Sequence, residues 1–150
     1  MRSVLNIFII FSISINVLQA QGQYSAARYE IDAKRAVTTI TSDDALPRSR
    51  EFIRLDSTYY VGYMYEGIYK YNHAADAIGF QQAIPALEKA VQLFEKENAP
   101  ILKSIYSSIT YYNQNLKLYD DYLQSMRALK ECYDNLEMAD KVMAVLAKIQ

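Results

Sequence analysis

Between residues 57 and 97, small and large side chains alternate at spacings of three and four residues. The small residues are Gly62, Gly67, Ala74, Ala75, Ala83, Ala86 and Ala90, and the large ones are Tyr63, Tyr71, Phe80, Leu87 and Phe94. Such spacings place residues on one face of an α-helix, and small residues let two helices approach closely while rings fill the gaps. The stretch therefore predicts an antiparallel hairpin, with a first helix to about residue 78, a turn at Gly79 and a second helix to residue 97.

The same periodicity predicts helices along the rest of the chain. The expected ranges are 25–40, 45–55, 100–118, 119–133 and 136–149. Pro100 is expected to end the helix before it, because a proline disfavours helical geometry in the preceding residue. No segment alternates with period two over enough residues to predict a strand. We therefore expect an all-α fold of about three helical pairs plus a closing C-terminal helix.

Composition excludes several classes of function. The 150 residues carry 16 basic and 17 acidic side chains, for a net charge of −1, so a strongly basic nucleic-acid surface is excluded. Cys132 and His73 are the single residues of their kinds. An intrachain disulfide, a zinc site of several thiolates and a two-histidine metal site are therefore excluded, and we expect no cofactor.

The first 22 residues have the order of a secretory signal peptide. A short basic start at 1–3 precedes an apolar run over 4–17, and small residues follow at Ala20 and Gly22. A transmembrane helix is the alternative, but it needs about 20 predominantly apolar residues, and this run is shorter and interrupted by Asn and Ser. We expect cleavage after Ala20 or Gly22 and a helical domain over 23–150. The expected location is periplasmic or secreted, because no cysteine near the cleavage point could carry a lipid anchor.

Residues 56–133 resemble the tetratricopeptide repeat. The matching positions are Leu55-Asp56-Ser57 between repeats, Tyr63 and Gly67 in a first helix, Phe80, Ala83 and Ala90 in a second, and Pro100, Tyr106, Ile109 and Tyr119 in the next unit. The spacing departs from the family: Tyr63 and Tyr106 are 43 residues apart and Phe80 and Tyr119 are 39 apart, against about 34 in the family. The tyrosine- and asparagine-rich sequence is also similar to envelope proteins of Bacteroidetes-type bacteria.

The resemblance implies a right-handed superhelix of helical hairpins with a concave groove. It also implies an exported scaffold, not an enzyme, that binds a peptide segment of an envelope partner in that groove. The implied groove residues are Met64, Ile68, Tyr71, Asn72, Ser107, Tyr111, Gln114 and Asn115. Their hydroxyl and amide groups predict a neutral groove without a basic clamp.

Two other functions remain open from the sequence. The 14 tyrosines could form a stacking platform for a small molecule or a glycan, although most are expected to fill the core. Cys132 and His73 could form a nucleophile pair, although a lone cysteine on an apolar stripe is more often a core residue. The C-terminal helix could cap the array, pair with another copy or continue into further repeats.

The export signal makes a direct prediction. When the whole chain is expressed in a secreting bacterium, the protein recovered outside the cytoplasm should begin at Gln21 or Gln23, which intact-mass spectrometry measures. Replacing two residues of the apolar run with arginine should retain the uncleaved chain inside the cell. Recovery of an uncleaved chain from the membrane would instead support the transmembrane alternative.

Overall fold

The computed structural model describes residues 25–105 and 116–149. Within them lie six helices and no strand, so the predicted all-α class is confirmed. The helices are α2 (Ala26–Arg35), α3 (Ala45–Leu55), α4 (Tyr60–Asn72), α5 (Ala77–Ile105), α7 (Leu116–Asn135) and α8 (Ala139–Ile149). The expected signal peptide lies outside the described residues. None of these helices has an apolar stretch long enough to span a bilayer.

Short polar side chains fix several helix starts. The Ser25 hydroxyl accepts a hydrogen bond from the Arg28 amide at 3.2 Å and so caps α2. Asp76 does the same for α5, where its carboxylate accepts from the Gly79 amide at 2.8 Å. Between α7 and α8 the chain turns through Glu137, whose φ of 56° lies in the left-handed region. These local signals delimit the helices before any tertiary contact is considered.

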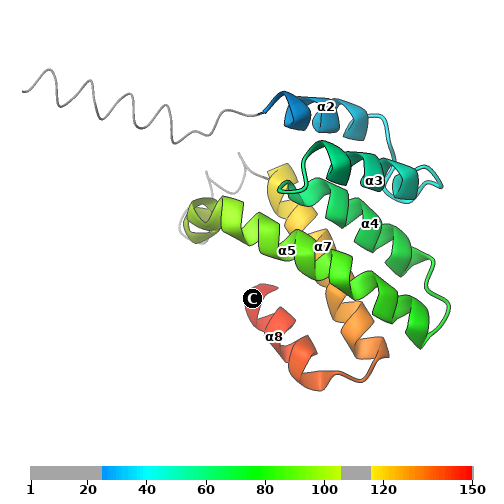
Figure 1. Ribbon diagram of the computed structural model, residues 1–150. Coiled ribbons are helices and arrows are strands. Elements are labelled where there is room, and N and C mark those ends of the chain that lie inside the picture. The colour runs from blue at the N-terminus through cyan, green and yellow to red at the C-terminus, as the bar shows by residue number, and fades with distance from the viewer. Residues whose placement is uncertain (1–24, 106–115, 150) are drawn as a thin grey trace, which may run out of the picture.

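Successive helices run in opposite directions (Figure 1). In the central hairpin, Tyr60 at the start of α4 meets Phe94 late in α5, with ring centroids 4.9 Å apart. Tyr71 near the end of α4 lies 6.2 Å from Phe80, near the start of α5. The chain therefore folds into three antiparallel pairs in the described residues, α2/α3, α4/α5 and α7/α8, in which α2, α4 and α7 run one way and α3, α5 and α8 the other.

The core lies where α4 packs between α3, α5 and α7. The seam between α4 and α5 depends on Gly67, because a Cβ atom there would come within 2.7 Å of the Leu87 side chain and 2.9 Å of its amide nitrogen. A Cβ on Gly62 would similarly lie 2.7 Å from Ile53 on α3. The two glycines thus let α4 approach a neighbour on each side.

Two predicted boundaries of the central hairpin were wrong, and α2 ends at Arg35 instead of residue 40. The turn between α4 and α5 occupies residues 73–76, and Gly79 lies inside α5. The second helix does not stop before Pro100 but continues to Ile105. Pro100 removes the donor to a single carbonyl, that of Lys96, which is an exposed residue where water can replace the bond. Asn98, just past the expected end of the helix, is buried and donates to the Phe94 carbonyl at 3.0 Å.

The third pair also differs from the prediction. A pair over 99–133 followed by a closing helix was expected, but residues 100–105 belong to α5. The third pair consists of α7 and α8. The helix expected to close the array is therefore the second helix of a pair, and α7 is a first helix.

Gly67 provides a test in which two effects have opposite signs. Helix propensity alone predicts that Gly67→Ala stabilises the protein by about 1 kcal/mol. Because the new methyl group would meet Leu87, we expect a loss of about 1–3 kcal/mol instead, and a larger loss for Gly67→Leu. Chemical denaturation measures both, with Ala77→Leu at an exposed position of α5 as the control. A Gly67→Ala protein more stable than the parent would contradict the close seam.

Candidate functional site

A buried carboxylate joins α2, α4 and α7, which are the first helices of the three pairs. Asp121 of α7 accepts hydrogen bonds from the Arg35 guanidinium of α2 and, at 2.8 Å, from the Tyr60 hydroxyl of α4. The side chains of Arg35 and Asp121 are 13% and 7% exposed. Because an unpaired charge at such a site would be strongly unfavourable, the three groups hold α2, α4 and α7 in one relative position.

The electrostatics of this cluster follow from its burial. Burial acts to lower the pKa of Arg35, but the hydrogen bond and the charge of Asp121 outweigh it and raise that pKa above its ordinary value. Burial, together with the negative charge of Asp121, raises the pKa of the Tyr60 hydroxyl. The arginine therefore stays charged and the tyrosine stays a hydrogen-bond donor. Nearby, the Tyr65 hydroxyl donates to the Thr38 carbonyl at 3.0 Å and ties α4 to the segment after α2.

Beside this cluster, α4, α7 and the segment after α2 enclose a hollow of 290 Å³, called here the α4/α7 hollow. Apolar side chains and exposed polar ones both line it. The lining residues are Ile40, Thr41, Ile68, Tyr71, Asn72, Gln124, Arg127, Ala128 and Glu131. The hollow thus combines an apolar base with amide, hydroxyl and charged groups that could contact a peptide backbone and its side chains.

The predicted groove residues separate into three groups. Tyr71 and Asn72 line the α4/α7 hollow, Asn72 as an exposed residue. Ile68 also lines the hollow but is only 7% exposed and belongs to the core. Met64, which is 1% exposed, packs in the core instead of facing a groove. Ser107, Tyr111, Gln114 and Asn115 lie outside the described residues. That the exposed members contact a partner stays a prediction.

The sequence interpretation missed the α7 side of the hollow. Gln124, Arg127 and Glu131 were overlooked because α7 was interpreted as the second helix of its pair. They are spaced three and four residues apart on one helix face, a signal that would have identified them once α7 was taken as a first helix. Arg127 and Glu131 also place charges of both signs at the hollow, where a neutral groove was expected.

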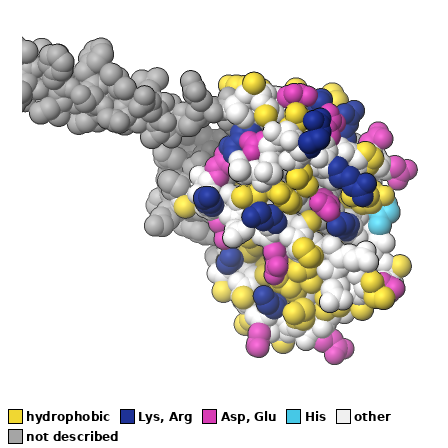
Figure 2. All heavy atoms as spheres, in the orientation of Figure 1, with side chains coloured by type: hydrophobic (Ala, Val, Ile, Leu, Met, Phe, Trp, Pro, Cys, Tyr) yellow, Lys and Arg dark blue, Asp and Glu magenta, His cyan; other side chains and the backbone are white. Residues whose placement is uncertain are grey.

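A second hollow of 580 Å³ lies between α5 and α8, with α7 as its base; we call it the α5/α8 groove. Its apolar lining includes Val91, Met126, Leu129 and Val145. Figure 2 shows apolar side chains on this face between the two helices, with acidic and basic side chains beside them. The groove is thus apolar at its base and charged along its edges.

Two glutamates on α5 hold the edges of this groove. Glu88 accepts from the Tyr133 hydroxyl of α7 at 2.5 Å and lies 3.8 Å from the Lys141 ammonium of α8. Seven residues further, Glu95 accepts from Tyr122 at 2.9 Å and from Lys148 at 2.8 Å. These lysine and glutamate side chains are between 32% and 54% exposed, so each ion pair contributes about 0–1 kcal/mol. The repeated arrangement fixes the register of α7 and α8 against α5.

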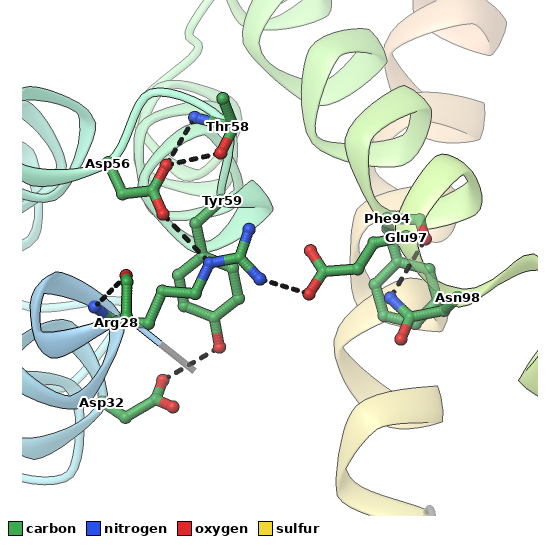
Figure 3. Close-up of polar contacts among 9 residues, drawn as sticks. Arg28, Asp32, Asp56, Thr58, Tyr59, Phe94, Glu97 and Asn98 are labelled. Atoms are coloured by element: carbon green, nitrogen blue, oxygen red, sulfur yellow. Dashed lines mark hydrogen bonds and ion pairs between the residues drawn. The ribbon is translucent and has the colours of Figure 1, made fainter. Parts of the chain in front are cut away.

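A further polar cluster connects the first pair to the central one (Figure 3). Arg28 of α2 donates to Asp56 at 2.9 Å and pairs with Glu97 of α5. Its guanidinium lies 4.7 Å from the centre of the Tyr59 ring, whose hydroxyl donates to Asp32 at 3.1 Å. This cluster connects α2 to the start of α4 and to α5.

Cys132 and His73 have the environments of structural residues. Cys132 is fully buried, and burial raises the pKa of its thiol to about 11, so the thiol is protonated near neutral pH. His73 is exposed at the end of α4, where its ring stacks on Tyr69 with centroids 4.0 Å apart and its Nδ1 lies 2.8 Å from the Tyr69 carbonyl. Among the described residues, no three His, Cys, Asp or Glu side chains converge as a metal site.

Comparison of this chain with protein-family models, with curated proteins and with solved structures found no match.

The buried Asp121 cluster makes a graded prediction. Asp121→Ala should lower the free energy of unfolding by about 3–5 kcal/mol, because it leaves the Arg35 charge buried without its partner. Tyr60→Phe removes one hydrogen bond and should lower it by about 1–2 kcal/mol. Asp120→Ala, at the exposed neighbouring position, is the control and should change it by less than about 0.5 kcal/mol. Equal losses for the two aspartates, measured by denaturant titration, would contradict the assignment.

Proposed function

We propose that this protein is an exported interaction scaffold of tetratricopeptide-like hairpins that binds a peptide segment of an envelope partner. The observation that carries the proposal is the α4/α7 hollow, which lies between two first helices that run in the same direction. In a right-handed stack of hairpins, the first helices would form the concave face on which such scaffolds bind peptides.

The order of the helix pairs supports the proposed superhelix. The pairs α2/α3, α4/α5 and α7/α8 repeat the same direction of the chain. Each second helix packs on the first helix of the next pair, as shown by Phe52 of α3 against Tyr65 of α4 and by Phe94 of α5 against Tyr122 of α7. A right-handed twist from pair to pair is part of the proposal.

The chemistry of the hollow fits a peptide better than a planar small ligand. Asn72 and Gln124 are exposed amides that can donate to and accept from a peptide backbone. Ile68 and Ala128 provide an apolar base for one side chain, and Arg127 and Glu131 can pair with charged neighbours. The tyrosine-platform alternative has less support, because Tyr71 is the tyrosine that lines this hollow and Tyr133 the one that lines the α5/α8 groove. The protonated Cys132 thiol likewise gives no support to nucleophilic catalysis.

Site-specific photo-crosslinking tests the proposal. A photoreactive phenylalanine analogue at Asn72 or Gln124 should capture the same segment of one envelope protein in intact cells, identified by peptide mass spectrometry. The matched control carries the analogue at Arg54, an exposed position on the second helix α3, and should not capture it.

A blocking variant makes the crosslinking result specific. Gln124→Trp should fill the hollow, leave the folded state intact because position 124 is exposed, and abolish capture from Asn72. Capture from Arg54 that equals capture from Asn72, or capture that persists in the Gln124→Trp protein, would contradict binding in the α4/α7 hollow.

A further inference from the structure

In the part of the chain that the structure describes, three carboxylates are held by the same combination of partners. Each accepts a hydrogen bond from a tyrosine hydroxyl on a second helix and pairs with a cation from a third helix. The three sets are Asp121 with Tyr60 and Arg35, Glu88 with Tyr133 and Lys141, and Glu95 with Tyr122 and Lys148. A carboxylate can satisfy both partners at once, because its two oxygens offer about four lone-pair sites.

The α4/α7 hollow holds the tyrosine and the cation of such a set without the carboxylate. Tyr71 of α4 and Arg127 of α7 both line it. Among the described residues, neither the Tyr71 hydroxyl nor the Arg127 guanidinium has a hydrogen-bond or ion-pair partner. No buried side-chain oxygen or nitrogen in those residues lacks a partner, so the Tyr71 hydroxyl is accessible from outside. Both donors are therefore available to a bound molecule.

The acidic side chains of the sequence are all placed elsewhere. All 17 of them lie within the described ranges, and none of them pairs with Arg127. Glu131 lines the hollow, but its carboxylate accepts from Lys130 at 3.2 Å. Arg127 precedes Glu131 by four residues, and on a helix this order favours an ion pair less than the reverse order does. The carboxylate that would complete the set is therefore left for a partner to provide.

We propose that the peptide bound in the α4/α7 hollow carries an aspartate or glutamate side chain that Tyr71 and Arg127 hold together. This inference rests on the peptide-binding function proposed above and specifies the sequence that is bound. The Tyr71 hydroxyl donates to the carboxylate and the Arg127 guanidinium pairs with it. The contact is a fourth set of the kind that joins the helices of the fold, with the carboxylate supplied by the partner.

The apolar base of the hollow adds a second feature to the bound sequence. Ile68 lies three residues before Tyr71 on α4, and Ala128 directly follows Arg127 on α7. The apolar base therefore adjoins the two donors. Since an extended peptide rises about 3.3 Å per residue, the acidic residue should lie within two positions of an apolar one.

Selection from a library of displayed peptides tests this inference. Short random peptides, joined to the carrier at both ends so that they present no free carboxyl terminus, are bound to protein from cells expressing the whole chain. Peptides whose binding is lost with Gln124→Trp occupy the hollow. They should be enriched in aspartate or glutamate within two positions of an apolar residue. The same selection on Arg127→Glu should enrich lysine or arginine there instead.

Two variants assign the acidic preference to its side chains. Arg127→Gln and Tyr71→Phe should each weaken binding of a selected peptide about tenfold, because each removes a donor to a charged acceptor. Position 127 is exposed and phenylalanine keeps the ring, so the helical circular dichroism should not change. Arg54→Gln, at an exposed arginine of α3, and Tyr63→Phe, on α4 but outside the hollow, are the matched controls and should bind like the parent.

The possible failures are distinguishable. Peptides that occupy the hollow without acidic enrichment would overturn this inference and leave the proposed peptide binding intact. Acidic peptides whose affinity either Arg127→Gln or Tyr71→Phe leaves unchanged would have the same consequence. A selection in which Gln124→Trp blocks no peptide would contradict the proposed function itself, and this inference with it.

Discussion

The bridge from Arg35 through Asp121 to Tyr60 is the constraint on which the arrangement of the first helices depends. It joins residues 86 and 61 positions apart in the chain, so it forms only when all three pairs are in place. A buried ion pair adds little net stability compared with well-packed apolar side chains. Its effect here is on geometry, because any shift of α7 relative to α2 or α4 would leave a buried charge without its partner. The α4/α7 hollow has its shape because of that restriction.

Tyrosine is the side chain that connects helices throughout this fold. Tyr59, Tyr60, Tyr65, Tyr122 and Tyr133 are buried, and each hydroxyl donates to an acceptor on another segment. In three cases that acceptor carboxylate also pairs with a cation from a third helix: Asp121 with Arg35, Glu88 with Lys141 and Glu95 with Lys148. A phenylalanine would fill the same space but could not make the connection. This accounts for the abundance of tyrosine better than a ligand-stacking platform does.

Local sequence signals predicted the elements more reliably than their pairing. The range of α3 and the close seam at Gly67 followed from residue spacing, because both depend on contacts that a helical period determines. The end of α5 did not follow, since Pro100 weakens a helix by one hydrogen bond and tertiary packing can exceed that loss. That single boundary changed which two helices form the third pair. It turned α7 from a second helix into a first one, which is why Tyr71 and Asn72 were recognised while Gln124, Arg127 and Glu131 were not.

The sequence by itself determined that the described chain is helical, that α4 approaches its neighbours closely and that His73 and Cys132 are single. Helical period, side-chain size and residue count are properties of the chain, so no fold is needed to establish them. The tertiary structure decided which helices become partners and which side chains meet across them, including the convergence of Arg35, Tyr60 and Asp121. Such contacts join residues far apart in the chain, and their energy arises only when several helices have already packed, so no local pattern contains them.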